Sequence, residues 1–366
     1  MSRFLDERYA AMKPYVPGEQ PQDKRYVKLN TNESPFPPSP AVLAALNGEE
    51  VAKLNLYSDP TAKVLVDAIA ARFDRISREG GGKGIKPSQV FVGNGSDEVL
   101  AFCFQAFCGK DKGMACPEIG YGFYPVFCEI FGIKFNSVPL REDFSIDVKA
   151  FEGIKDNITI ANPNAQTGIY LPVSDIKTLL SADKDRLVII DEAYCDFGGE
   201  SALGLLDEFD NLIVVQTMSK SRQLAGGRVG FAIASEAIVE DLNKMKFSFN
   251  PYNLNRLSIL AGAAAVSDEE YFEMTTSAVK AEREKLKKTL AELGFFVTPS
   301  LANFVLAAHP KIGGKELYLA LKEKGVLVRF LSDEALKPYV RITVGSKEQN
   351  DALIDAIKQI IKEKGI

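Results

Sequence analysis

Short apolar runs alternate with helix-like stretches from residue 88 to residue 234, and this alternation constrains the fold more than any other feature of the chain. Such runs, bounded by turn residues, are typical of buried strands. We expect strands at residues 89–92, 113–116, 134–138, 158–161, 187–190, 212–215 and 229–234, with helices between most of them. The alternation predicts a largely parallel sheet with helices on both faces and a ligand site outside the carboxyl ends of the strands.

After residue 255 the pattern changes. Apolar residues from Phe272 to Leu293 share one face of a long charged helix that should stop at Gly294. Further strands are expected at residues 304–307, 326–330 and 339–344, with helices at 315–324 and 347–364. This order of elements predicts a smaller α+β domain closed by a terminal helix.

The first residues of the chain are rich in proline and lack sustained periodicity, so they must lie against another part of the protein. A disordered N-terminus is the alternative, but Tyr15 and the segment with Asn and Glu residues that follows it favour ordered contacts. A chain of 366 residues also exceeds the usual size of one hydrophobic core. We therefore expect an N-terminal arm (1–46) that packs with the small domain, a large domain (47–255) and a small C-terminal domain (256–366).

Composition excludes several classes of function. A net charge of -5 with interspersed signs gives no reason to expect binding to nucleic acid or to a membrane surface. No apolar stretch approaches the roughly 20 residues that span a bilayer, and the start lacks the apolar core of a signal peptide, so we expect a cytoplasmic protein. Five cysteines without C-x-x-C spacing and a single histidine predict no metal site, and we interpret the cysteines as buried small apolar residues.

The loop between the last two strands of the large domain carries the strongest candidate for chemistry, Lys220. Lysine alone is usually a solvated surface residue, so its surroundings must carry the interpretation. A lysine at the end of a sheet, partly desolvated and near cations, favours the neutral amine that attacks a carbonyl or forms a Schiff base. The same loop holds polar side chains suited to an anion such as a phosphate monoester: Thr217, Ser219, Arg222 and Arg228.

Residues 219–230 read S-K-S-R-Q-L-A-G-G-R-V-G. This segment resembles the S-K-x-x-x-L-A-G-x-R-x-G motif of fold-type I pyridoxal-phosphate enzymes, specifically the histidinol-phosphate aminotransferase branch. The resemblance implies an α/β fold with a mostly parallel sheet, a small α+β domain and pyridoxal 5'-phosphate as cofactor. It also implies that Lys220 carries the cofactor, while Thr217, Ser219 and Arg228 contact its phosphate.

A second part of a phosphate site follows the expected strand 89–92, where Gly93-Asn94-Gly95-Ser96-Asp97-Glu98 precedes an apolar helix. Free backbone N–H groups at a helix N-terminus favour a phosphate, although a plain capping sequence is the alternative. By the resemblance, Ser96 and Asp97 form half of the phosphate-binding cup.

Asp191 ends a fully apolar strand, and a buried carboxylate there needs a partner such as a protonated pyridine nitrogen. A loop or capping acid is the alternative. By the resemblance, Asp191 pairs with the cofactor ring nitrogen and Tyr194 donates to its phenolic oxygen. Tyr121 resembles the tyrosine that stacks on the ring, with one extra residue between it and Pro117; a core aromatic is the alternative.

Tyr57 lies in a segment that resembles the family's Y-P-D-P element, whose tyrosine reaches the cofactor phosphate of the neighbouring subunit and so implies a homodimer. Residues 162–168 depart from the family's N-P-N-N-P-T-G, because Ala165 and Gln166 replace an asparagine and a proline. That asparagine bonds the cofactor oxygen in the family. Either Asn162 or Asn164 takes its place after a backbone shift, or the bond is missing and Tyr194 carries the role.

Two arginines, Arg329 and Arg341, lie in apolar strands of the small domain, where a guanidinium favours a planar or tetrahedral anion. A structural ion pair is the alternative, and for Arg329 the two interpretations are equally supported. By the resemblance, these arginines bind the substrate together with Tyr15 and Asn32 of the arm, which crosses the substrate entrance.

The implied reaction is transamination of L-histidinol phosphate with 2-oxoglutarate, giving imidazole acetol phosphate and L-glutamate in histidine biosynthesis. The partners are then a small-molecule amino donor and a 2-oxo acid, and Lys220 also acts as the general acid/base. Alternatives within the fold are an aromatic amino acid aminotransferase and a threonine-phosphate decarboxylase. A regulator that binds the cofactor without turnover is disfavoured, because no DNA-binding module adjoins the domain.

Overall fold

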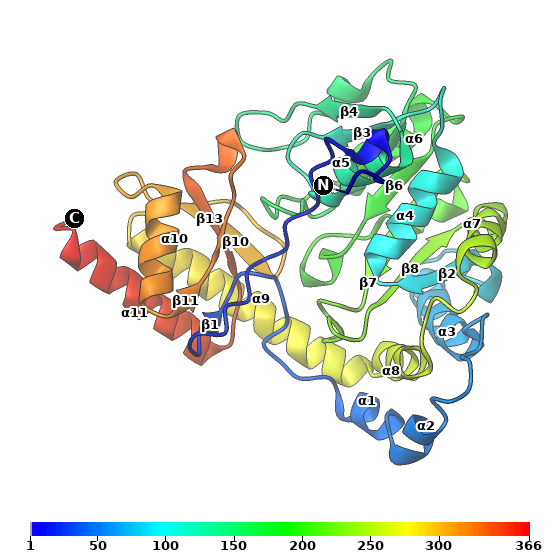
Figure 1. Ribbon diagram of the computed structural model, residues 1–366, viewed down its shortest axis with the longest axis horizontal. Helices are drawn as coiled ribbons and strands as arrows, with labels where there is room; N and C mark the ends of the chain where they lie inside the picture. The colour runs from blue at the N-terminus through cyan, green and yellow to red at the C-terminus, as the bar shows by residue number, and fades with distance from the viewer. Residues whose placement is uncertain (1) are drawn as a thin grey trace.

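The computed structural model describes residues 2–366 and contains a seven-stranded sheet in the order β2-β8-β7-β6-β5-β3-β4 (Figure 1). Its strands run parallel except β8, which is antiparallel to both of its neighbours. The strands are β2 (Val90–Asn94), β3 (Met114–Pro117), β4 (Phe135–Val138), β5 (Asn157–Ala161), β6 (Val188–Asp191), β7 (Leu212–Thr217) and β8 (Val229–Ala234). The prediction of a mostly parallel α/β sheet is therefore confirmed.

Helices cover both faces of this sheet because its central strands are apolar on both sides. Along β6, Ile189 joins the core under α4, α5 and α7, whereas Val188 and Ile190 join the core under α6. Alternation of side chains between faces is the ordinary geometry of a strand. The helices are α3 (Lys63–Glu79), α4 (Ser96–Phe107), α5 (Phe123–Phe131), α6 (Val173–Ala182), α7 (Glu236–Phe249) and α8 (Arg256–Ser267).

A four-stranded antiparallel sheet in the order β12-β13-β10-β9 forms the centre of the small domain. Its strands are β9 (Phe296–Val297), β10 (Phe304–Ala308), β12 (Arg329–Phe330) and β13 (Tyr339–Thr343). Three helices pack against it: α9 (Glu269–Glu292), α10 (Gly314–Glu323) and α11 (Lys347–Glu363). The long helix α9 joins this domain to the large one (Figure 1).

The prediction of a single strand at residues 326–330 is wrong, because the chain forms two short strands there. β11 (Val326–Leu327) pairs with the arm, whereas β12 pairs with β13. The hydrophobic pattern is continuous across both strands, so it does not reveal the change of partner.

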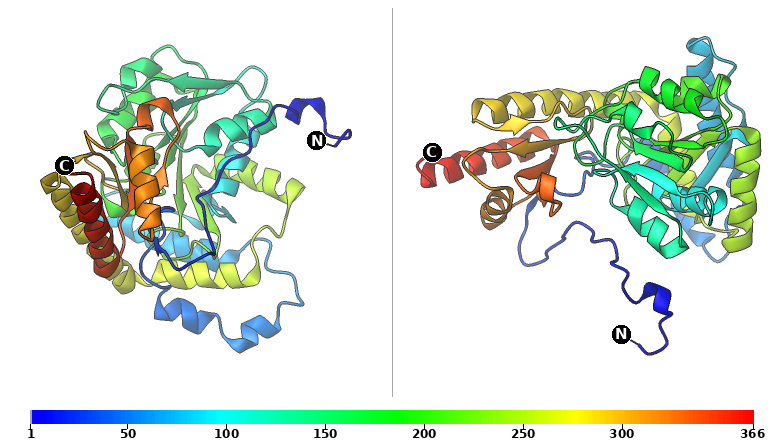
Figure 2. Two further views of the ribbon diagram at one scale, coloured as in Figure 1. Left: turned by 60° about the vertical axis from the view of Figure 1, so that its left-hand side comes forward. Right: turned by 90° about the horizontal axis from the view of Figure 1, so that it is seen from above.

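The arm is tied to the small domain through β1 (Val27–Lys28), which runs parallel to β11. Two short helices, α1 (Pro40–Ala45) and α2 (Gly48–Ala52), connect the arm to the large domain. The arm runs between the two domains in Figure 1, and Figure 2 shows its N-terminal end standing out from the body. Short 3₁₀ turns complete the chain: η1 (Glu7–Tyr9), η2 (Pro87–Gln89), η3 (Val148–Phe151), η4 (Cys195–Phe197), η5 (Ala202–Asp207) and η6 (Glu334–Leu336).

The division into 1–46, 47–255 and 256–366 stays a prediction. Helix α8, which that division assigns to the small domain, packs against α3 and α1 in the structure. Its residues Ile259 and Ala265 share a core with Leu65 of α3 and Phe231 of β8. In its packing, α8 therefore belongs with the large sheet.

Among residues 2–366, no helix is both long enough and apolar enough to cross a membrane. All five cysteines are free thiols, and four of them are buried. The interpretation of the cysteines as buried apolar residues is confirmed for those four, while Cys108 is only partly covered.

Candidate active site

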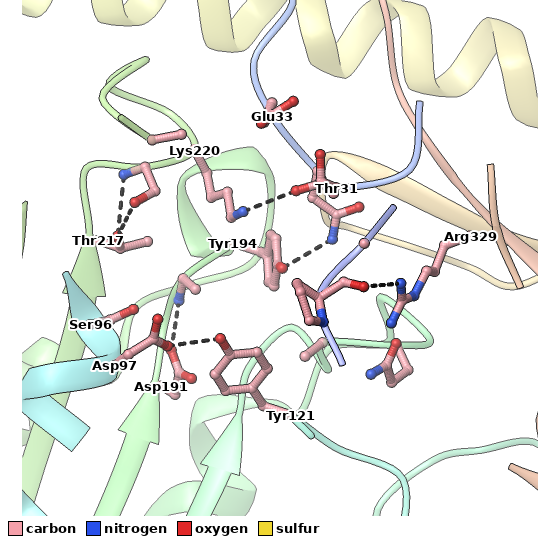
Figure 3. Close-up of a pocket in the computed structure, with 18 of the residues that line it drawn as sticks. Thr31, Glu33, Ser96, Asp97, Tyr121, Asp191, Tyr194, Thr217, Lys220 and Arg329 are labelled. Carbon is pink, nitrogen blue, oxygen red and sulfur yellow. Dashed lines mark hydrogen bonds between the residues drawn. The ribbon is translucent and has the colours of Figure 1, made fainter. Parts of the chain in front are cut away.

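A cavity of about 290 Å³ opens at the carboxyl ends of the large-domain strands, where the arm and the small domain meet them (Figure 3). Most of the side chains singled out in the sequence line it. They are Tyr15, Asn32, Ser96, Asp97, Tyr121, Asp191, Tyr194, Thr217, Ser219, Lys220, Arg228, Arg329 and Arg341.

Lys220 extends from the loop after β7 toward the arm. Its Nζ donates a hydrogen bond to the backbone oxygen of Thr31 at 3.3 Å and lies 5.9 Å from the centre of the Tyr194 ring. Burial, assisted by the positive charge of Arg341, lowers the pKa of the Lys220 amine to about 8. A substantial fraction is therefore neutral and nucleophilic near physiological pH. The Thr31 contact is made by a backbone carbonyl, which leaves no signal in the sequence.

The anion-binding end of the cavity combines the N-terminus of α4 with the loop before β8. A Cβ atom on Gly95 would lie 2.4 Å from Nη2 of Arg228, and one on Gly230 would lie 2.3 Å from the backbone nitrogen of Ser96. Only glycine allows so close an approach, and Gly95 also has a φ of +80°. The two elements thus bring orphan N–H groups of a helix and a guanidinium together, which suits a phosphate.

Hydroxyl and carboxylate groups complete this end. The hydroxyls of Thr217 and Ser219 lie 3.0 Å apart, and Ser219 also donates its backbone N–H to Thr217 Oγ1 at 3.2 Å. Asp97 Oδ2 accepts from Arg228 Nη2 at 3.2 Å, and its other oxygen accepts from the Tyr121 hydroxyl at 2.8 Å. Asp97 therefore holds the arginine and the tyrosine in fixed positions.

Asp191 ends β6 and is buried at the base of the cavity. Burial raises the pKa of its carboxyl group to about 6, while hydrogen bonds from Tyr124 and from the backbone of Ala193 favour the ionised form. The Tyr124 hydroxyl donates to Asp191 Oδ2 at 2.8 Å. Sequence reasoning missed Tyr124, whose only signal is its position three residues after Tyr121. A ring nitrogen that carries a proton would give this carboxylate the charge partner it lacks.

Tyr194 faces the same cavity from the other side. Its hydroxyl accepts from Nδ2 of Asn32 at 3.0 Å, and its ring packs edge-on against Phe304. Burial raises the pKa values of Tyr194 and Tyr121, so both hydroxyls keep their protons and remain donors. Asn32 has a φ of +54° and is fixed by a hydrogen bond from its backbone N–H to Thr343 Oγ1 at 2.9 Å.

Asn162 and Asn164 do not line the cavity, contrary to expectation. The amide of Asn162 exchanges two hydrogen bonds with the backbone of Leu171, at 2.8 and 2.9 Å. The amide of Asn164 donates to Ile119 O at 2.7 Å and accepts from the backbone N–H groups of two residues that follow it. Both amides hold turns in the structure, and a contact of either one with the cofactor oxygen stays a prediction.

Arg222 also departs from the expected anion-binding cluster. Its guanidinium is buried, donates to Ala265 O at 2.9 Å, pairs with Glu269 at 3.3 Å and lies 3.7 Å above the ring of Phe272. These partners come from α8 and α9, more than 40 residues away along the chain. Arg222 therefore attaches the lysine loop to these helices and is not available to an anion in the cavity.

The two arginines of the small domain, Arg329 and Arg341, form hydrogen bonds with different parts of the protein. Arg329 donates to the backbone oxygens of Val16 and Pro17 at 2.8 and 3.0 Å, and so holds the arm across the cavity. Arg341 donates to Ala165 O at 2.9 Å and Gln166 Oε1 at 2.8 Å. All these acceptors are uncharged, so none of them neutralises the positive charge of either guanidinium group.

Tyr57 lies outside the cavity with 81% of its surface exposed, and its ring stacks on Tyr252 at 4.6 Å. The loop that carries it is held by a hydrogen bond from Ser58 to Leu254 O at 2.6 Å. Its reach into a neighbouring subunit stays a prediction.

The sequence pattern of the family "Aminotransferase class I and II" matches residues 24–357, and the chain belongs to this family. Within it, the chain is 45% identical to a histidinol-phosphate aminotransferase of Brachyspira hyodysenteriae over 363 residues, which cover 99% of this chain and 100% of that protein. It is 48% identical to histidinol-phosphate aminotransferase 1 of Methylococcus capsulatus over 350 residues, 96% of this chain and 95% of that one.

Among solved structures, the histidinol-phosphate aminotransferase of Sinorhizobium meliloti in complex with pyridoxal-5'-phosphate aligns with a TM-score of 0.82. The alignment covers 93% of this chain and 92% of that chain. At 23% sequence identity, this likeness shows that the fold is shared.

Proposed function

We propose that this chain catalyses the transamination of L-histidinol phosphate with 2-oxoglutarate, giving imidazole acetol phosphate and L-glutamate in histidine biosynthesis. The observation that carries the proposal is the convergence of Lys220, Asp191 and the cationic Arg341 on one cavity. The extended similarity to histidinol-phosphate aminotransferases supports the choice of amino donor.

Pyridoxal 5'-phosphate is the cofactor, and the residues of the cavity suit each of its groups. Ser96, Ser219 and Arg228, with the N-terminus of α4, would hold the phosphate. Asp191 would hold the protonated ring nitrogen, and Tyr194 would donate to the phenolic oxygen. When bound, the cofactor supplies an electron sink for the negative charge that develops at the substrate carbon.

Lys220 would serve both as the covalent attachment point and as the base that removes the proton from the substrate carbon. Its lowered pKa favours both roles, because each requires a neutral amine. Arg341 would hold the anionic end of each substrate, which is a phosphate in the amino donor and a carboxylate in 2-oxoglutarate. The arm, held by Arg329, would limit the entry of water.

We also propose that the protein is a cytoplasmic homodimer. The loop of Tyr57 and the segments near it expose apolar side chains that a second copy would cover: Leu43, Val51, Leu54, Leu56, Tyr57 and Tyr252. Sedimentation at assay concentrations measures the oligomeric state directly. An active monomer would reject the proposal that Tyr57 reaches into the neighbouring subunit.

The deciding experiment compares kcat/KM for L-histidinol phosphate, phenylalanine and tyrosine with 2-oxoglutarate as common acceptor. We expect a clear preference for L-histidinol phosphate. A preference for an aromatic amino acid would replace the proposal with an aromatic aminotransferase, and release of carbon dioxide from threonine phosphate would replace it with a decarboxylase. Lys220→Ala serves as the control, because it should lose turnover with every donor and the pH-dependent absorption band of the bound cofactor.

A further inference from the structure

Gln166 stands where the family pattern has a proline, and its side chain lines the cavity. Its backbone N–H donates to Asn164 Oδ1 at 2.9 Å, a hydrogen bond that proline lacks the donor to make. The turn around Gln166 is therefore fixed by its own backbone, which leaves the side-chain amide available for another role.

That amide meets the guanidinium of Arg341. Nη1 of Arg341 donates to Gln166 Oε1 at 2.8 Å and to the backbone oxygen of Ala165 at 2.9 Å. An arginine Nη1 carries two hydrogens, so these two acceptors use both of them. The side chain of Gln166 is itself held by a hydrogen bond from Nε2 to Gly120 O at 3.3 Å.

The opposite edge of Arg341 consists of Nε and Nη2, which form a fork suited to two oxygens of one anion. Nε of Arg341 is buried and has no hydrogen-bond partner among the described residues. A buried donor without a partner is unfavourable, so this atom points to a ligand. Arg329 offers no equivalent fork, because its Nη1 and Nη2 donate to the arm.

We propose that Gln166 is a positioning residue for substrate recognition, which holds Nη1 of Arg341 and thereby presents the Nε–Nη2 edge to the anionic group of the substrate. The ligand class is a phosphate monoester or a carboxylate. This inference rests on the proposed function and extends it to a residue that the family motif does not contain.

The chemical identity of Gln166 fits this role. A glutamine oxygen accepts the hydrogen bond without neutralising the guanidinium, so the charge of Arg341 stays available to the substrate. A glutamate would accept the same bond but would place a negative charge beside the anion. A methionine has a similar shape and offers no comparable acceptor, so Gln166→Met removes the contact with little change in volume.

The test uses L-histidinol phosphate and L-histidinol, two amino donors that differ only in the phosphate. For each variant we take the ratio of their kcat/KM values. Gln166→Met should lower this ratio about tenfold, mainly through KM of the phosphorylated donor, as expected when a charged group loses a hydrogen-bond partner. Gln166→Glu should lower it further, because of its charge.

A double-mutant cycle separates positioning from a general structural effect. If Gln166 acts through Arg341, Gln166→Met should have no further effect on the ratio in an Arg341→Met background. Gln22→Met makes the same chemical change at an exposed arm residue outside the cavity and should leave the ratio unchanged. Gln166→Ala repeats the test if Gln166→Met alters the melting temperature.

Equal losses with both donors, or additive losses in the double variant, would overturn the assignment of Gln166. Failure of the proposed function looks different, because the unmodified protein would then not turn over L-histidinol phosphate. The same cycle run with L-phenylalanine and L-phenylalaninol, which differ in a carboxylate, then decides the role of Gln166 independently.

Discussion

The sheet side of the cavity is built within one seven-stranded sheet, whereas the opposite side is assembled from the arm and the small domain. Asp191 pairs in register with Val215 across β6 and β7, so the acid and the start of the lysine loop share one rigid support. Tyr15 and the carbonyls of Val16 and Pro17 lie in a segment without regular secondary structure.

The interactions on the two sides differ accordingly. The sheet side depends on apolar strands buried on both faces, and displacing them would disrupt the core of the large domain. The arm side depends on the two residue pairs of β1 and β11, on the bonds of Arg329 and on the stacking of Tyr15 with Phe123 at 4.2 Å. The comparison predicts that the groups for chemistry are held rigidly, while the arm that encloses the substrate can adjust.

The largest expected effect is on the sheet side. Asp191→Asn keeps the shape of the residue but removes the charge that would balance a protonated ring nitrogen. We expect kcat to fall by about 100-fold or more, the range found when one preorganised electrostatic contact is lost, with a smaller loss of cofactor affinity. Steady-state kinetics measures kcat, and titration of the apoenzyme with pyridoxal 5'-phosphate measures the cofactor affinity. Near-normal turnover would mean that another acid contacts the ring.

The next prediction has an effect of intermediate size and concerns the pKa of Lys220, on which both sides of the cavity act. Burial and then the charge of Arg341 lower this pKa to about 8, so the neutral amine becomes populated as the pH rises through that value. The rate at which apoenzyme binds the cofactor aldehyde covalently should therefore increase with pH around a midpoint near 8. Arg341→Met removes a cation that disfavours the protonated amine, so its midpoint should move to higher pH. An unchanged midpoint in stopped-flow absorbance would show that the two sides are electrostatically independent.

The smallest effect should come from the arm. Glu19 binds Tyr318 and Lys322 of α10, and both members of the Glu19–Lys322 ion pair remain about one-third exposed. Exposed pairs contribute roughly 0 to 1 kcal/mol, so Glu19→Gln should raise KM only about twofold and leave kcat unchanged. The pair of Lys324 and Glu363 lies outside the cavity, and Glu363→Gln is the matched control. A large fall in kcat would mean that the arm takes part in chemistry.

The sequence predicts the sheet side better than the arm side, and the reason is physical. Asp191 directly follows one apolar run and Lys220 lies in the loop after the next, so the strand ends indicate where they meet. The separate fates of Arg222 and Arg228 depend on partners in distant helices, which the local pattern does not contain. The family motif predicts Asn162 or Asn164 at the cofactor, whereas their amides bind nearby backbone groups in the structure.

The same limit applies to groups without a side-chain signature. Thr31 contacts Lys220 through its backbone, and the split between β11 and β12 depends on which neighbour each strand finds. Gln166 could be recognised as a departure from the family motif, yet its contact with Arg341 required the structure. These features depend on contacts between residues that are far apart in the sequence.

The pairing of β1 with β11 joins residues that are 299 positions apart, Val27 and Val326. During synthesis the arm leaves the ribosome early, but its partner strand is made only near the end of translation. The arm of the nascent chain therefore remains unpaired, while the large domain can already form its core. Bringing such distant segments together carries a loop-closure cost that only the late contacts repay. The cavity is thus completed last, and a chain cut short before residue 326 would keep its lysine loop but have no docked arm above it.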